Sequence, residues 1–329
     1  MSDHGNISVF VPHIGCPHIC SFCDQRVISG ETKAPEAKDV VEACLKAQEK
    51  KGKENLELAF FGGSFTGLSR SYMTELLEAP QSFLGNLING IRLSTRPDFI
   101  NEEILTILKM YHVTSVELGS QSMCNEVLKA NLRGHSKEDT IEASKLIKNF
   151  GFSLGLQMMT GLYMSDFEKD METAKEIIAL SPDTVRIYPT ITIKNTHLAE
   201  LYYEGKYNPP SLDETVTLCS KLIPMFNDAG IKVIKVGLHP SLELEEKIVA
   251  GPYHRAFGEL VMSRIMLDKL VKLLENVPKG DVLVHIRKGE TSKLVGQKRQ
   301  NMLYLNGLGY NIKVVEQEGI PPLSPQLQA

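Results

Sequence analysis

The sequence of 329 residues lacks any apolar run near the roughly 18 residues that a membrane-spanning helix requires. Its first residues, MSDHGNISVFVPH, hold neither a basic segment nor a long apolar stretch, so we expect no secretory signal and a cytoplasmic location. A strong charge of one sign is also missing, since 36 Lys and Arg stand against 40 Asp and Glu, for a net charge of -4. Any nucleic-acid surface therefore has to be local.

Cysteine is scarce, with six residues, and in a reducing compartment these are not expected to form a disulfide framework. Three of the six, Cys44, Cys124 and Cys219, are scattered through predicted helices, and we interpret them as small apolar packing residues. The other three lie close together, an arrangement that more often binds metal or carries out redox chemistry. The remaining composition, 42% hydrophobic and 23% charged, is that of a folded globular protein.

Short apolar runs alternate with amphipathic segments, which is typical of repeated βα units and a parallel sheet. The predicted strands lie at 7–11, 56–61, 90–94, 113–119, 152–158, 183–189 and 231–237. The predicted helices between them include 38–51, 101–111, 137–150 and 166–180. Six or seven such units predict an α/β fold, a partial or closed (β/α)6-7 barrel rather than an open doubly wound sheet.

The pattern changes after about residue 240, so we expect a barrel domain over 1–240 and a C-terminal extension over 241–329. A small α+β appendage is predicted there, with a helix at 256–277, a strand at 281–286, a helix at 292–308 and a strand at 310–316. The last residues, GIPPLSPQLQA, are rich in proline and have no core pattern, so we expect a flexible tail.

The three clustered cysteines, Cys16, Cys20 and Cys23, follow the first predicted strand with the spacing C-x3-C-x2-C. A closed zinc site needs four ligands, which would require His13, His18 or a distant residue to complete it. Alternatively, three thiolates bind three irons of a 4Fe-4S cluster and leave the fourth iron free for a small molecule. We favour the cluster, because an aromatic residue between the cysteines, a double glycine after the second strand and the barrel pattern accompany them.

The cysteine loop resembles that of the radical SAM superfamily, whose pattern is C-x3-C-x-aromatic-C, with Phe22 at the aromatic position. Over roughly residues 7–240 the chain resembles in particular the radical SAM domain of the Elongator catalytic subunit family, in the stretches CPHICSFCDQ, FFGGSFTG, STRPD, ELGSQSM and YPTITIKNTHLAELYYEGKY. That family continues into an acetyltransferase domain, for which we expect this chain to be too short. The resemblance implies a 4Fe-4S cluster and S-adenosylmethionine as cofactors.

The resemblance also assigns residues to the cofactors, with Cys16, Cys20 and Cys23 on the cluster and the ring of Phe22 near the adenine. Gly62, Gly63 and Ser64 resemble the family's GGE-type motif, whose backbone binds the methionyl ammonium group. Glycine suits this role because it lets the backbone approach closely. Ser64 departs from the pattern, since an acid often stands at its position.

Further residues follow the predicted strands, where barrels of this type build their active sites. Glu117 and Gln121 resemble the ribose-contacting stretch after the fourth strand, and Arg133 resembles the arginine that pairs with the methionyl carboxylate. Glu117 lies in an apolar strand, and because burial without a partner would be costly, we expect it to make a functional contact. Weaker candidates are Ser94, Gln157 and Tyr188 for the cofactor, and Lys194 and His197 for a substrate pocket or for structural capping.

The resemblance implies reductive cleavage of S-adenosylmethionine to a 5′-deoxyadenosyl radical that abstracts hydrogen from a substrate. An electron donor such as flavodoxin or ferredoxin is implied with it, because such clusters work at low potential. Three hypotheses stay open: a radical enzyme acting on RNA, in particular tRNA; a radical enzyme acting on a small molecule or peptide; and a zinc-stabilised binding protein without catalysis.

One stretch of the C-terminal extension, RKGETSKLVGQKRQNM followed by YNIKVVE, resembles the K-homology arrangement, in which a GxxG loop grips a nucleic-acid backbone. Arg299 replaces the second glycine of that loop. Between 281 and 317, six Lys or Arg stand against three Asp or Glu, a local surplus of three positive charges. The extension is therefore either a cap packed on the barrel or an RNA-binding surface.

Overall fold

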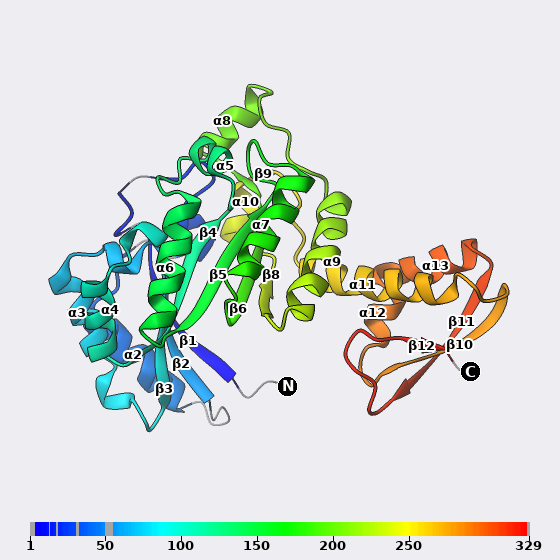
Figure 1. The fold of residues 1–329 in the computed structure, drawn as a ribbon, viewed down its shortest axis with the longest axis horizontal. Coiled ribbons are helices and arrows are strands. Elements are labelled where there is room, and N and C mark those ends of the chain that lie inside the picture. The colour runs from blue at the N-terminus through cyan, green and yellow to red at the C-terminus, as the bar shows by residue number, and fades with distance from the viewer. Residues whose placement is uncertain (1–3, 13, 18, 31–32, 50–54, 328–329) are drawn as a thin grey trace. The chain divides into compact units, whose positions relative to one another are not determined.

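The computed structural model describes residues 4–12, 14–17, 19–30, 33–49 and 55–327 (Figure 1). It divides into two compact units, one of residues up to 210 together with 226–252, and one of 211–225 together with 253 onward. Helix α9, Leu212–Asp228, contributes to both units. The domain boundary near residue 240 stays a prediction.

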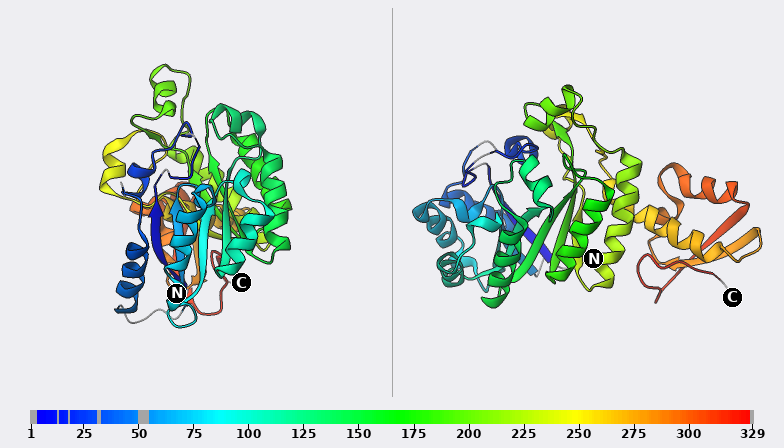
Figure 2. Two further views of the ribbon diagram at one scale, coloured as in Figure 1. Left: turned by 90° about the vertical axis from the view of Figure 1, so that its left-hand side faces the viewer. Right: turned by 45° about the horizontal axis from the view of Figure 1, so that its top comes forward.

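A seven-stranded parallel sheet forms the first unit (Figures 1 and 2). In sheet order its strands are β1 His4–Val11, β2 Asn55–Gly62, β3 Ile88–Thr95, β4 Val113–Gln121, β5 Ser153–Thr160, β6 Thr184–Pro189 and β8 Lys232–Val236. All seven predicted strands are present, which confirms the α/β prediction. Because β1 and β8 are the two edges of the described sheet, the barrel is the partial form, a curled half-barrel.

Helices connect successive strands of this sheet. They include α1 Gln25–Ser29, α2 Ala37–Glu49, α3 Arg70–Glu78, α4 Glu102–Met110, α5 Asn125–Ala130, α6 Lys137–Asn149, α7 Phe167–Ala179 and α8 His197–Tyr203, whereas α10 Leu242–Lys247 follows the last strand of the sheet. Shorter elements include the 3-10 turns η1 Phe65–Gly67, η2 Gln81–Phe83 and η3 Pro97–Phe99 and the antiparallel pair β7 Thr192–Ile193 and β9 Ile248–Ala250. Side-chain caps set several helix starts, as at Asn101, whose Oδ1 accepts from the Ile104 N–H at 2.9 Å.

Successive side chains of a strand point to opposite faces, and the two faces of this sheet differ in chemistry. Leu93, Val116 and Ile187 are fully buried apolar residues, whereas the residues beside them in sequence are polar or charged. Helix α6 packs against β4 and β5, and α7 packs against β5. We call the face that carries Arg92, Glu117, Gln157 and Arg186 the inner face.

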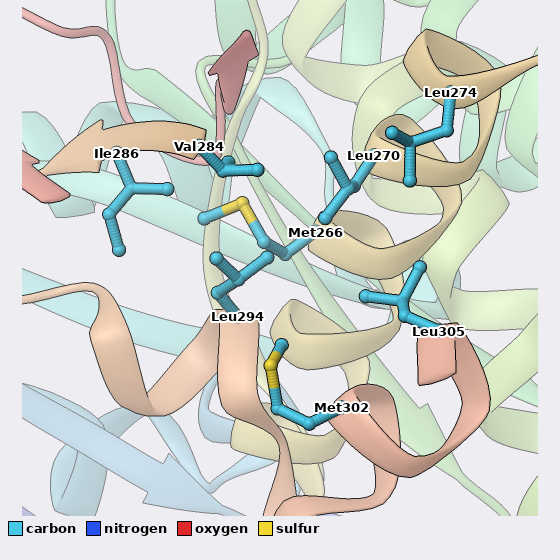
Figure 3. Packing of buried hydrophobic residues seen from close by; sticks show 8 residues of the cluster. All are labelled: Met266, Leu270, Leu274, Val284, Ile286, Leu294, Met302 and Leu305. Carbon is cyan, nitrogen blue, oxygen red and sulfur yellow. The ribbon is translucent and has the colours of Figure 1, made fainter. Parts of the chain in front are cut away.

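The second unit contains α11 Phe257–Leu274, β10 Gly280–Arg287, α12 Thr291–Val295, η4 Gln297–Arg299, α13 Gln300–Gly307, β11 Tyr310–Gln317 and β12 Gln326–Leu327. Strand β10 pairs in parallel with β11 and antiparallel with β12. Residues of α11, β10, α12 and α13 meet in one apolar core (Figure 3), which consists of Met266, Leu270, Leu274, Val284, Ile286, Leu294, Met302 and Leu305. The predicted α+β appendage is therefore present.

The prediction of a flexible C-terminal tail is wrong for the residues described up to 327. Ile320 is buried, and Leu323 and Leu327 pack against the apolar core of the unit. The Leu323 carbonyl accepts a hydrogen bond from Lys269 Nζ at 2.8 Å, and its N–H donates to Glu290 Oε2 at 2.9 Å. Single apolar residues spaced along a proline-rich stretch anchor the tail, and they give no helical or strand period in the sequence.

In the part of the chain that the structure describes, no helix is long and apolar enough to cross a membrane.

Candidate functional site

The loop that carries the three cysteines packs tightly against the turn after β2. A Cβ atom on Gly15 would lie 2.2 Å from the carbonyl oxygen of Ser64, and Gly15 has a φ of +80°. Gly62 has a φ of +111°, and a Cβ there would lie 2.9 Å from the carbonyl oxygen of Val11, while the Gly63 N–H donates to the same oxygen at 2.7 Å. Only glycine allows these approaches, so the double glycine fixes the end of β1 and the base of the cysteine loop.

Each of the three cysteine sulfurs accepts a hydrogen bond from this chain. Arg133 Nη1 donates to Cys20 Sγ at 3.1 Å, and Gln25 Nε2 donates to Cys23 Sγ at 3.4 Å. The backbone N–H of Ser64 donates to the Cys16 thiol. Donors of this kind stabilise a sulfur in its thiolate form, the form that binds metal.

Burial of the cysteine side chains disfavours their thiolate form when no metal is present. It raises the pKa of the Cys16 thiol, and burial together with the neighbouring Cys20 raises the pKa of Cys23 to about 12. Both thiols therefore keep their protons at neutral pH unless a metal replaces them. Among the described residues no three His, Cys, Asp or Glu side chains converge on a single ion. A cubane differs, because each thiolate binds a separate iron. His13 and His18, the candidate zinc ligands, lie outside the described residues.

Beside the cysteines, the end of β4 holds a group of buried polar atoms without partners in the described structure. They are Gln121 Oε1, Arg133 Nε and His135 Nδ1. Arg133 Nη2 also donates to the Gly119 carbonyl at 2.5 Å, which aims the guanidinium between β4 and Cys20. Gln121 has a φ of +64°, a left-handed conformation that a non-glycine residue seldom adopts.

These orphaned atoms indicate a missing ligand. Buried polar groups are nearly always hydrogen-bonded, and three exceptions in one place need an explanation. Burial and the charge of Arg133 lower the pKa of His135 to about 4, so this ring stays neutral and can accept or donate. The residues present thus fit a polar cofactor bound against the cysteine loop.

A second polar group lies on the inner face around Glu117, whose side chain is 1% exposed. Its carboxylate accepts from Arg92 Nη1 at 2.9 Å, from Arg186 Nε at 2.7 Å and from Gln157 Nε2 at 3.0 Å. Gln157 also donates to Ser94 Oγ at 3.3 Å. Burial would raise the pKa of Glu117, but the charges of Arg186 and Arg92 hold it below its usual value. Tyr188 joins this group through the Arg186 side chain.

The predicted site residues therefore fall into two groups. Around the cysteine loop lie Cys16, Cys20, Phe22, Cys23, Gly62, Gly63, Ser64, Gln121 and Arg133, and on the inner face lie Ser94, Glu117, Gln157 and Tyr188. Their roles toward a cofactor stay predictions, because the structure shows only contacts within the protein.

Two predicted residues, Ser64 and Phe22, make contacts that their sequence positions did not indicate. The Ser64 hydroxyl lies 2.8 Å from Thr95 Oγ1 and accepts from the Arg96 N–H at 3.2 Å, so it ties the turn after β2 to the end of β3. Phe22 packs in an apolar cluster with Cys20, Leu162 and Tyr207.

Lys194 and His197, the candidates for a substrate pocket, make local contacts. Lys194 Nζ donates to the Glu246 carbonyl at 3.2 Å, and His197 Nδ1 lies 2.9 Å from Glu200 Oε2 within the first turn of α8. These contacts correspond to the capping alternative. Of the predicted packing cysteines, Cys44 and Cys219 are fully buried and Cys124 is half-buried.

Arg92 and Arg186 are the residues that sequence reasoning missed. Each is a charged residue in an otherwise apolar strand, in GIRLS and DTVRIYP, the same signal that drew attention to Glu117. Read together, three such charges in strands of one sheet would have predicted an ion-pair network.

The chain is similar in sequence to two protein-family models and to several known proteins. Residues 10–176 match the model of the Radical SAM superfamily, and residues 182–267 match the model of the Radical_SAM C-terminal domain. The tRNA uridine(34) acetyltransferase of Methanocaldococcus infernus is 38% identical over 131 residues, which are 39% of this chain and 24% of that protein. Elongator complex protein 3 of Homo sapiens is 28% identical over 233 residues, which are 64% of this chain and 42% of that protein.

A solved structure of the archaeal Methanocaldococcus infernus Elp3 with an N-terminal deletion superposes with a TM-score of 0.66 at 24% identity. It covers 82% of this chain and 64% of that chain. The structural match confirms the barrel fold, and the family and sequence matches confirm the predicted resemblance. The matched stretches span less than half of both curated relatives.

Proposed function

Because the chain belongs to the radical SAM superfamily, whose members generally use a 4Fe-4S cluster and S-adenosylmethionine, we propose that it uses both to start radical chemistry on RNA. The observation that carries this proposal is the set of three cysteine sulfurs, each with a hydrogen-bond donor, beside three buried polar atoms without partners at the end of β4. An electron donor such as flavodoxin or ferredoxin belongs to the proposal.

The chain's own residues would divide the work as follows. Cys16, Cys20 and Cys23 would hold three irons as thiolates, and Arg133 would place a positive charge beside Cys20 and the methionyl carboxylate. Gln121 Oε1, which has no partner in the described structure, would accept a hydrogen bond from the nucleoside. When bound, the cluster and S-adenosylmethionine supply the 5′-deoxyadenosyl radical that abstracts hydrogen from the substrate.

Apolar packing would keep water from the site. Phe22 lies in the cluster formed with Leu162, Leu198 and Tyr207, and the side chain of Phe22 is only 8% exposed. This cluster lies directly beside Cys20, which belongs to it. A dry surrounding strengthens each of the polar contacts to the cofactor.

Two observations favour RNA as the substrate. One relative is named a tRNA uridine(34) acetyltransferase, although the match covers 39% of this chain. In the second unit, Lys298 and Arg299 are exposed in the turn between α12 and α13, with φ values of +50° and +63°. Asn301 stabilises the chain around this turn, because its Nδ2 donates to the carbonyl oxygens of Leu294 at 3.0 Å and Ser263 at 3.1 Å.

The proposal is tested first by metal content after anaerobic reconstitution. The wild-type protein is expected to be brown, with broad absorbance near about 400 nm and about four irons per chain. C16A, C20A and C23A should each lose this iron and colour. C124A is the matched control, because Cys124 is half-buried and packs against the same apolar cluster as Cys20 and Cys23.

A colourless protein with one zinc would replace the proposal with the non-catalytic zinc-stabilised protein. Equal loss of iron in C124A and in the three other variants would refute the assignment of the ligands. If the iron is present, incubation with S-adenosylmethionine and dithionite should release 5′-deoxyadenosine. Acceleration by total tRNA supports an RNA substrate, whereas acceleration only by small-molecule or peptide pools contradicts it.

A further inference from the structure

The inner face of the sheet carries two positive charges more than it has negative charges. Strand register places Lys235 of β8 beside Arg186 of β6, and Lys232 beside Thr184 at the exposed N-terminal end of β8. Together with Arg92 these are four cations, and the carboxylates of this face are Glu57 and Glu117, so the difference is 4 − 2 = +2. Paired residues of adjacent strands present their side chains to the same face, so Lys235 belongs to the inner-face group.

The surplus is at the two lysines of β8, and because Lys232 is exposed to solvent, the half-buried part of it is at Lys235. Arg92 pairs with Glu57 at 3.0 Å and with Glu117 at 2.9 Å, and Arg186 pairs with Glu117 at 2.7 Å. The side chain of Lys235 forms no ion pair or hydrogen bond with any residue that the structure describes. It is nevertheless half-buried, and burial and the charge of Arg186 lower its pKa.

Lys235 and the cysteine loop belong to opposite edges of the sheet. It is the penultimate residue of β8, at the C-terminal end of the strand, where barrels bind their substrates. The cysteines follow β1, and β1 and β8 are the opposite edges of the described sheet. The end of β8 is also tied to β6, because the Gly237 N–H donates to the Ile187 carbonyl at 3.0 Å.

The cation beside Lys235, Arg186, is held in place by contacts within the protein. Arg186 is fixed by two hydrogen bonds to Glu117 and lies over the Phe61 ring, 5.1 Å from its centroid. Arg186 is therefore committed to Glu117 and does not compete for a second anion. Lys235 keeps three N–H donors and a full charge for a ligand, and a half-buried ammonium group without a counter-ion is costly.

We propose that Lys235 is an anchor for an anionic group of the substrate, a phosphate or a carboxylate, at the edge of the inner face opposite the cysteine loop. An anion bound there supplies the missing negative charge and holds the substrate while its other end reaches the cofactor. The assignment of the anion to the substrate rests on the proposed function.

The test is calorimetric titration of the protein, without cluster or S-adenosylmethionine, with three probes at low salt: inorganic phosphate, adenosine monophosphate and succinate. K235M should weaken the binding of at least one probe by ten-fold or more. K232M is the matched control, because Lys232 is an exposed lysine at the N-terminal end of the same strand, and its binding should equal that of the wild type. K235R, which keeps the charge, should bind within a few-fold of the wild type.

The outcomes separate the two kinds of ligand and the two proposals. Selective loss of phosphate and adenosine monophosphate supports a nucleotide substrate, and selective loss of succinate supports a small acid; each supports the anchor. Equal affinities in K235M, K232M and the wild type, with unfolding midpoints unchanged, overturn it. A brown protein that cleaves S-adenosylmethionine but shows no Lys235-dependent binding refutes only the anchor. Lys235-dependent binding in a protein that takes up no iron refutes only the proposed function.

Discussion

The end of β4 and the inner face both bury polar side chains of one sheet, yet they differ in how these groups are satisfied. Around Glu117 the carboxylate oxygens are taken by Arg92 of β3, Gln157 of β5 and Arg186 of β6. At the end of β4, three polar atoms have no partner in the described structure. The Glu117 carboxylate is satisfied within the protein and ties strands together, whereas the second group is open to a ligand. Only the second is beside the cysteines.

Two buried carboxyl groups of this unit also differ in their partners, because one is paired with charged groups and the other only with neutral ones. Glu117 is paired with two guanidinium groups, and its pKa is lowered. Asp170 of α7 has neutral partners, the Gly161 N–H at 2.8 Å and the Ser165 hydroxyl at 2.6 Å, and burial raises its pKa to about 7. Gly161 also accepts from the Tyr207 hydroxyl at 2.7 Å, and Tyr207 packs in the apolar cluster of Cys20. Asp170 thus supports the surroundings of the cysteine loop.

The largest effect is expected from Glu117→Gln. It leaves Arg186 buried without a counter-charge and breaks a network that joins β2, β3, β4, β5 and β6. Removing one partner of a buried pair costs about 3–5 kcal/mol, so the free energy of unfolding in urea should fall by that amount. Glu318→Gln is the control, because its ion pair with Lys288 is exposed and should contribute about 1 kcal/mol or less. Equal losses in the two variants would show that the buried network around Glu117 does not stabilise the sheet.

A smaller effect is expected from the pH dependence that Asp170 introduces. The folded pKa of about 7 is above the ordinary value of 3.8, so the folded state holds a proton that the unfolded state has released between these values. The free energy of unfolding therefore falls as pH rises from about 4 to about 7, by at most about 1.4 kcal/mol per unit. Asp170→Asn carries no such proton and should flatten this slope.

The measurement is urea unfolding between pH 5 and pH 8. Asp228→Asn, the same change at the exposed last residue of α9, is the control and should keep the wild-type slope, because an exposed carboxyl group on another helix leaves the surroundings of Asp170 unchanged. A wild-type slope in Asp170→Asn would contradict the buried, unpaired state of this carboxyl. Glu117 acts in the opposite direction, since its lowered pKa adds stability above the unfolded value that is lost as pH falls.

The sheet and the cysteine loop could be predicted from the sequence because their signals are local. Apolar runs mark each strand, and the spacing of Cys16, Cys20 and Cys23 stands within eight residues. The α+β appendage followed from the same alternation. Gly62 and Gly63 were singled out for close backbone approach, and the structure places the Gly62 Cα against Val11.

Pairing between strands could not be predicted, because it depends on which strands become neighbours. Glu117 was expected to contact a cofactor since a buried acid needs a partner, and Arg92 of the adjacent strand β3 and Arg186 of β6, two strands away, meet that need. The charge surplus at Lys235 likewise exists only once β8 lies beside β6. The tail after Ile320 gave no period, because each of its apolar residues enters the core alone.

The smallest effect concerns the second unit, where an exposed basic turn can be compared with basic residues elsewhere in the unit. Lys298→Glu with Arg299→Glu should weaken the binding of total tRNA by about ten-fold at low salt and reduce the slope of log affinity against log salt by about 2. Lys279→Glu with Arg287→Glu is the matched control, with the same charge change at two exposed positions of the same unit. If Lys298 and Arg299 contact RNA phosphates, charge reversal at these two positions should weaken tRNA binding more than the same reversal elsewhere in the unit. Equal weakening in both double variants would reduce the effect to net charge and remove the turn from the proposed RNA site.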